Sequence, residues 1–121
     1  MDPRLTLGAA RFNEGDFFTA HEIWEEVWLE SVGAEKDLLQ SLVRIAAGYA
    51  KVESGIRGGA LKLLSRGLDG LQNWLRIHPD VILQTFAAGV GDDLDRVRTC
   101  TDKEVTLATV RPPQLRIPAA G

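Results

Sequence analysis

Apolar residues recur at the 3.6-residue spacing of an α-helix through most of this 121-residue chain, and glycine or proline stands near each break in the pattern. Gly15 and Gly55 are each placed to end one helix before the next begins, and Pro79 cannot continue a helix. The pattern therefore predicts an all-α protein. The expected helices cover residues 3–13, 17–31, 35–54, 60–78 and 80–98.

The second and fourth of these helices share one pattern at an offset of forty residues, the distance from Gly15 to Gly55. The matched pairs that follow the two glycines are Ala20 with Ala60, Trp24 with Leu64 and Trp28 with Leu68. This pattern resembles the turn and second helix of tetratricopeptide-type hairpins, in which a small residue lets two helices approach closely. Two such units are too few for a free-standing superhelix. We therefore expect a compact bundle of two TPR-like helical hairpins with the fifth helix as a C-terminal cap.

The chain is of a common size for a single domain. We expect residues 1–98 to form a single helical domain and residues 99–121 to form an irregular C-terminal tail, since this last part contains three prolines. The apolar residues Leu115 and Ile117 would let the tail lie as an arm on a surface, either of the chain itself or of a partner. A frayed terminus is the alternative.

Composition and charge exclude several classes of function. The net charge is −3 and the arginines are scattered, so we expect no nucleic-acid partner, which would need a clustered basic face. No apolar run approaches the length of a membrane span, and nothing near Met1 resembles a signal peptide. We therefore expect a cytoplasmic protein with no membrane association, whose partner is a small molecule or another protein. Self-association into a homo-oligomer is left open.

The helix expected over residues 17–31 is the most chemically suggestive part of the chain. Its apolar face holds Trp24 and Trp28, which we expect to be core residues, and its opposite face holds Glu22 with other glutamates, as is typical of a solvated surface. His21 and Glu25 lie one turn apart on the flank between the two faces. An imidazole and a carboxylate are thus expected side by side next to aromatic rings.

Three motifs carry a resemblance to a known family: FNEGDFFTAHEIWEEVW, LLQSLVRIAAGYAKVESG and GGALKLLSRGLDGL. Over roughly residues 5–75 they resemble the DUF309 family, a group of small all-helical prokaryotic proteins of unknown function. Its HExWE motif is matched here by His21, Glu22, Trp24 and Glu25, and a later glutamine by Gln40. The resemblance implies a helical fold and supplies no reaction.

The sequence allows three interpretations of His21 and Glu25. In the first, the pair is structural and is satisfied internally or by the third helix. In the second, it belongs to a ligand pocket between the second and third helices, with aromatic walls and convergent polar groups. The candidate ligand-binding residues of that pocket are His21, Glu22, Trp24, Glu25, Trp28, Gln40, Arg44 and Tyr49.

The third interpretation is catalytic. The run His-Glu-x-x-Glu is one residue short of the zincin motif His-Glu-x-x-His, so His21 and Glu25 would act in a small metal-assisted or acid–base hydrolase. A third ligand is lacking, because His78 and Cys100 are expected far from the pair. We therefore expect no metal and no cofactor. A ligand-binding or protein-interaction module is the favoured function, and the hydrolase is the alternative.

Arg44 gives the most specific structural prediction. It stands in the most apolar part of the third expected helix, and an unpaired buried charge is strongly destabilising. We therefore expect Arg44 to contact Glu25 or Glu22 across the helix interface, with His21 beside it. The acidic run at residues 91–95 lacks the spacing of a calcium loop and is expected to be a solvated helix turn.

Overall fold

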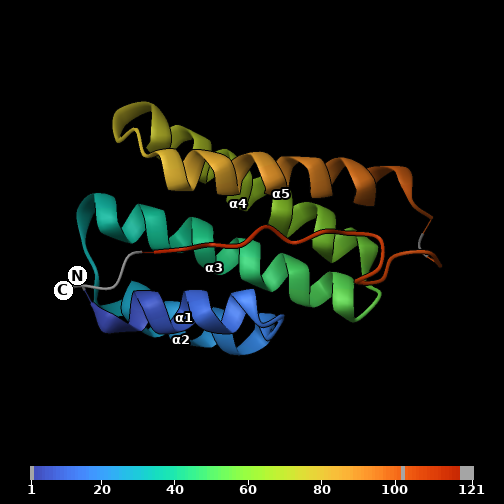
Figure 1. Cartoon of the computed structure of the whole chain (residues 1–121), viewed down its shortest axis with the longest axis horizontal. Helices are drawn as coiled ribbons and strands as arrows, with labels where there is room; N and C mark the ends of the chain where they lie inside the picture. Colours follow the sequence, from blue (N-terminus) through green and yellow to red (C-terminus); the bar gives the residue numbers. More distant parts are fainter. Residues whose placement is uncertain (1, 102, 118–121) are drawn as a thin grey trace.

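The computed structural model describes residues 2–101 and 103–117 as a series of helices followed by an irregular tail (Figure 1). The helices are α1 (Pro3–Asn13), α2 (Phe17–Glu30), α3 (Gly33–Glu53), α4 (Arg57–Ile77) and α5 (Val81–Thr99). The predicted all-α fold class is confirmed. α4 begins three residues before Ala60, the first residue of its apolar stripe, because the first turn of a helix need not contribute to the buried face.

Short polar turns separate the helices. Gly15 has a φ of 84°, in the left-handed region that glycine adopts without strain, and it ends the turn after α1. Asp16 then caps α2 by accepting the N–H of Thr19 at 3.3 Å, and Asp80 caps α5 by accepting the N–H of Leu83 at 2.9 Å. These local signals explain why the starts of α2 and α5 follow the sequence pattern, whereas α3 and α4 begin without a side-chain cap.

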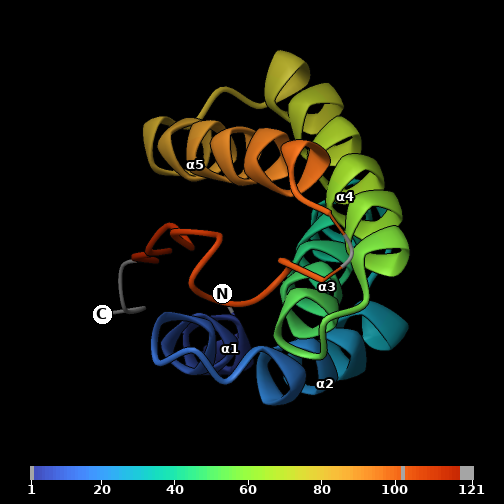
Figure 2. The same ribbon diagram turned by 90° about the vertical axis from the view of Figure 1, so that its right-hand side faces the viewer.

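Successive helices pack on one another in chain order, as two hairpins, α1–α2 and α3–α4, followed by α5. Seen along the helices, they form an arc with α1 at one end and α5 at the other (Figure 2). The ring centroids of Phe12 on α1 and Phe86 on α5 are 5.4 Å apart, so the two ends of the arc meet in the core. None of the helices that the structure describes is long and apolar enough to span a membrane.

An aromatic cluster fills the centre of the arc. The ring of Phe12 lies edge-on to those of Phe17 and Tyr49, with centroids 5.0 and 5.5 Å away, and Phe17 stacks on Tyr49 at 5.2 Å. Trp24 is fully buried, and its indole N–H donates to the carbonyl oxygen of Leu5 at 3.2 Å. The prediction that Trp24 is a core residue is confirmed.

Trp28 differs from this expectation. It is only half-buried, and the ammonium group of Lys36 lies 5.0 Å from the centroid of its ring. The prediction that Trp28 is a core residue is wrong, because it lies near the end of α2, where the start of α3 covers only part of the ring. Trp24 instead sits in the middle of α2, where α1 approaches so closely that a Cβ atom at Gly8 would overlap the indole.

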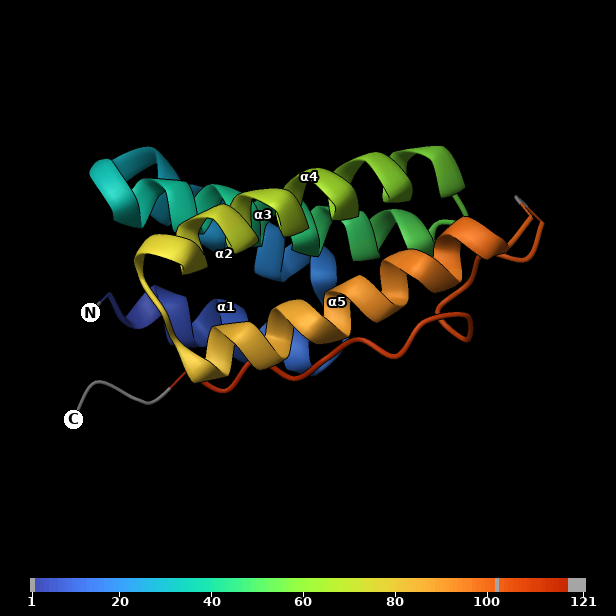
Figure 3. The ribbon, with the colours of Figure 1, turned by 90° about the horizontal axis from the view of Figure 1, so that it is seen from above.

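The tail lies inside the arc, between α1 and α5, and follows the length of α5 (Figures 2 and 3). Val105, Val110 and Leu115 are buried, with exposed fractions of 2%, 4% and 0%. The described part of the tail therefore lies as an arm on the surface of its own chain, which was one of the two alternatives. Residues 102 and 118–121 of the predicted tail lie outside the described residues.

Candidate functional site

His21 and Glu25 form the expected pair on α2. The Nε2 atom of His21 lies 3.1 Å from Oε2 of Glu25, and the side chains are 25% and 44% exposed. The other ring nitrogen, Nδ1, is buried and has no hydrogen-bond partner. The nitrogen that solvent or a ligand can approach is thus the one already occupied by the carboxylate. Glu22 is exposed, as expected for the solvated face.

Gln40 and Arg44 do not join this pair. Both line a groove of about 450 Å³ between α3 and α4, beside Ser41. Across residues 2–101 and 103–117, no hydrogen bond or ion pair links either side chain to α2. The predicted contact of Arg44 with Glu25 or Glu22 is therefore wrong, and with it the single polar cluster proposed for the interface of the second and third helices.

Helical phase explains the position of Arg44. The inward side of α3 is marked by the fully buried residues Leu39, Leu42, Ile45 and Tyr49. Arg44 follows Leu42 by two residues and is turned about 200° from it around the helix axis, so it faces outward. Arg44 is only half-buried, and the long aliphatic stem of an arginine lets its charged end reach water, so no carboxylate partner is needed.

The aromatic residues that were expected to line the pocket also lie elsewhere. Tyr49 and Trp24 are fully buried in the core, and Trp28 lies under Lys36 at the surface. The structure therefore places the polar candidates at two separate sites, with His21 and Glu25 paired on α2 and with Gln40 and Arg44 in the groove between α3 and α4, and it separates the aromatic side chains from the polar ones. No group of three or more histidine, cysteine, aspartate or glutamate side chains within the described residues is arranged to hold a metal ion.

A different cavity occurs at the end of the bundle that contains the start of α3 and the end of α4. We call this cavity of about 460 Å³ the end cleft. Most of its walls are apolar, with a few polar side chains at its edge. Its lining residues are Leu5, Ala34, Glu35, Leu38, Leu42, Trp74, His78, Asp80, Ile82, Leu83 and Ile117.

Trp74 holds one wall of the end cleft in place. Its indole N–H donates to the carbonyl oxygen of Ala34 at 3.0 Å, which joins the end of α4 to the start of α3. The imidazole of His78 lies against the Trp74 ring, with centroids 4.7 Å apart and an interplanar angle of 32°. The cleft therefore has one wall of rigid aromatic surface and a histidine at its edge.

Asp93 is a further buried polar centre that sequence reasoning missed. Its side chain is fully buried, and it accepts three hydrogen bonds: from the Tyr49 hydroxyl at 2.6 Å, from Arg96 Nη1 at 2.7 Å and from the backbone N–H of Arg111 at 2.8 Å. Burial, with the nearby Asp93 charge, raises the pKa of the Tyr49 hydroxyl far above its ordinary value. The expectation that the acidic run is a solvated turn is wrong for Asp93.

A signal for Asp93 was present in the sequence. Val90, Asp93 and Val97 follow the three- and four-residue spacing of one helix face, and both valines are fully buried. A carboxylate on an apolar stripe must find donors, since an unpaired buried charge is strongly disfavoured. The neighbouring Asp92 lies one residue away and is exposed, as expected for the opposite side of the stripe.

Comparison with known families gives one match. The model of the family described as "Domain of unknown function (DUF309)" matches residues 5–63. Over this stretch the chain resembles the DUF309 family. The predicted resemblance is confirmed, and the matched residues run from α1 through α3 into the start of α4. Neither the curated proteins nor the solved structures contain a match to the chain.

Proposed function

We propose that this protein is a small-molecule-binding module and that the end cleft is its site. The observation that carries the proposal is a cavity of about 460 Å³ with mainly apolar walls, which lies within the usual range of ligand pockets, roughly 300–1,000 Å³. Leu38 and Ile117 provide partly exposed apolar surface there, and Leu42 closes the floor as a buried residue. A ligand with an apolar body would bury this surface.

The edge of the cleft indicates the polar part of the ligand. Glu35 and Asp80 place two carboxylates there, and one oxygen of Asp80 is already used to cap α5. His78 adds an imidazole that stacks on Trp74. Carboxylates at the mouth of an apolar cavity favour a cationic or hydrogen-bond-donating group, so we propose a ligand with an apolar body and an amine head.

Binding of Nile red, a neutral apolar dye, tests the cavity. We expect the parent to bind the dye and Leu38→Phe, which fills part of the cleft, to bind it about tenfold more weakly, equivalent to roughly 1.4 kcal/mol of lost contact. Leu29→Phe adds the same ring on the exposed surface of α2, 67% exposed in the parent, and should leave the affinity unchanged. Equal dye affinity in all three proteins would contradict the proposal.

The head group is tested separately with decylamine and decanoate, which share an apolar chain and differ in charge. We expect decylamine to bind more tightly, and Glu35→Gln to weaken decylamine while leaving Nile red binding unchanged. If decanoate binds as well as decylamine, the assignment of an amine head is wrong and the apolar cavity stands.

The hydrolase alternative lacks support from the geometry of His21 and Glu25. A histidine that acts as a base needs one ring nitrogen that the reacting group can approach, and a carboxylate partner orients the ring through the other nitrogen. In this chain Glu25 lies at Nε2, and Nδ1 is buried, so no substrate atom can approach the free nitrogen. The pair is therefore better suited to a structural role at the surface of α2.

A further inference from the structure

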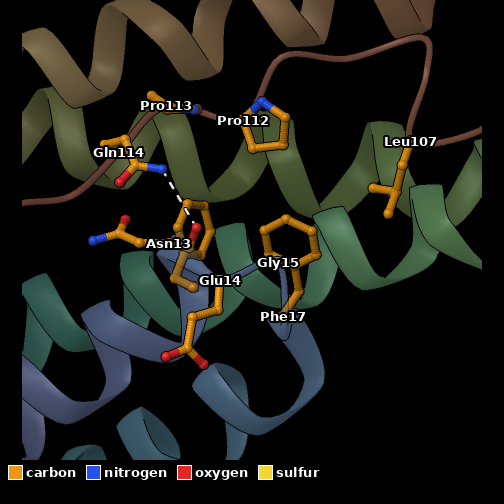
Figure 4. Close-up of a pocket in the computed structure, with 9 residues that line it drawn as sticks. Asn13, Glu14, Gly15, Phe17, Leu107, Pro112, Pro113 and Gln114 are labelled. Carbon is orange, nitrogen blue, oxygen red and sulfur yellow. Dashed lines mark hydrogen bonds between the residues drawn. The ribbon is translucent and has the colours of Figure 1, made fainter.

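The tail is held by side chains that bind its backbone. The backbone N–H of Leu115 donates to Oδ1 of Asn13 at 2.7 Å, and Nδ2 of Asn13 donates to the Leu115 carbonyl oxygen at 2.9 Å. One amide side chain on α1 thus satisfies both backbone groups of one tail residue, as a neighbouring strand would. Gln114 adds a longer contact, from its Nε2 to the carbonyl oxygen of Asn13 at 3.4 Å (Figure 4).

A second backbone contact comes from the opposite end of the arc. Asp93 on α5 accepts the backbone N–H of Arg111 at 2.8 Å, four residues before Leu115. Two helices that are far apart in the sequence therefore hold the same extended segment from its two sides. We call this site the tail groove, and its defining residues are Asn13 on α1 with Gly89 and Asp93 on α5.

Side-chain contacts give the groove a preference for certain residues. Leu115 is fully buried and Val110 nearly so, whereas Arg111, Gln114 and Arg116 face solvent. Pro113 lies so close to α5 that a Cβ atom at Gly89 would be 2.6 Å from it. The resident segment thus places Val110, the proline pair and Leu115 against the groove, and proline reduces the entropy lost when an extended segment is ordered.

The tail does not fill the groove. A pocket of about 260 Å³ remains between the tail and the turn that joins α1 to α2. It lies beside Pro112 and Pro113 and is lined on the helical side by Phe12, Gly15 and Phe17 (Figure 4). A peptide with a bulkier side chain near its proline pair would gain contacts there that the tail of this chain does not make.

We propose that the tail groove is a peptide-recognition site for an extended Pro-Pro-x-Leu segment of a partner protein, and that residues 110–117 are its resident competitor. Recognition through the backbone of an extended chain, with pockets for alternate side chains, is a recurring mode of peptide binding. A tethered tail competes at an effective concentration on the order of mM. A partner segment must therefore bind more tightly than the tail, or bind when the tail is released.

The test uses a fluorescein-labelled synthetic peptide of residues 105–117 and the full-length chain, with fluorescence polarisation as the measurement. Leu115→Asp weakens the tail and leaves the groove unchanged. We expect this variant to bind the peptide at least about tenfold more tightly than the parent, because the competing tail is removed. The double variant Leu115→Asp with Asn13→Leu loses the groove amide and should bind no better than the parent.

A peptide with aspartate in place of the leucine of position 115 is the matched control and should not bind. Leu115→Ala is a milder release variant that keeps the backbone contacts available, so the test does not depend on the folding of Leu115→Asp. If neither release variant binds the peptide more tightly than the parent, or if both peptides bind equally, the proposal is overturned. Nile red binding to the end cleft is measured on the parent chain with its tail in place, because Ile117 of the tail lines that cleft.

Discussion

Two polar sites of this protein differ in how deeply they are buried, and the difference is the reverse of what their sequence motifs suggest. His21 and Glu25 belong to the most recognisable motif, yet they form a single contact at a partly exposed surface. Asp93 belongs to an unremarkable acidic run, yet it is fully buried and is held by α3, α5 and the tail, with Tyr49 and Arg111 among its donors. The number of elements that converge on a polar group, rather than its place in a motif, indicates how much structure depends on it.

The largest effect is expected from the part of the HEIWE motif that faces inward. Trp24→Ala should lower the free energy of unfolding by about 3–5 kcal/mol, because the indole is fully buried and packs against Gly8. Trp28→Ala, at a half-buried ring, should cost less than half as much. Urea denaturation measures both losses, and equal losses would show that burial of the tryptophans on α2 does not decide the effect.

Asp93→Ala should come next, at about 2–4 kcal/mol, because it leaves the Tyr49 hydroxyl and the Arg111 N–H without an acceptor in a buried site. Asp92→Ala is the matched control, since Asp92 is exposed and its loss should change stability by no more than about 0.5 kcal/mol. The same urea titration distinguishes them. Similar losses of stability for the two variants would show that Asp93 contributes no more to the fold than an exposed aspartate.

Tyr49→Phe removes one donor to Asp93 and should cost about 1–2 kcal/mol at neutral pH. Burial raises the pKa of the Tyr49 hydroxyl far above its ordinary value of 10. Above pH 10 the unfolded phenol therefore loses its proton while the native one keeps it, and the parent loses stability. The gap between parent and Tyr49→Phe should narrow as the pH rises from 10 to 11 in urea titrations, and a constant gap would contradict this assignment.

Glu25→Gln should have the smallest effect, below about 0.5 kcal/mol, because the His21–Glu25 contact lies at a partly exposed helix surface where ion pairs contribute little. Glutamine also keeps an oxygen that can accept a hydrogen bond from His21. Thermal unfolding at pH 7 is sufficient to measure the change. A loss of stability comparable with that of Asp93→Ala would show that the His21–Glu25 pair supports as much structure as Asp93 does.

The helices themselves follow from local sequence. Their apolar spacing, the left-handed turn at Gly15 and the cap at Asp16 involve residues only a few positions apart, and such signals act before distant parts of the chain meet. The inward position of Trp24 follows from the same periodicity. The resemblance to the DUF309 family is also carried by short contiguous motifs, each centred on one helix and its adjoining turn, and the match over residues 5–63 agrees with it.

Only the tertiary structure decided which polar side chains meet across different helices and the tail. Asp93 is satisfied by Tyr49 and by Arg111, which are 44 and 18 residues away along the chain, and no local spacing encodes such partners. The sequence predicts a carboxylate partner on α2 for Arg44, but the phase of α3 turns this side chain outward to the groove that α3 shares with α4. The sequence by itself thus determined where helices form, because propensity and capping are local. Burial of Asp93 and binding of the tail required α1, α3 and α5 to converge.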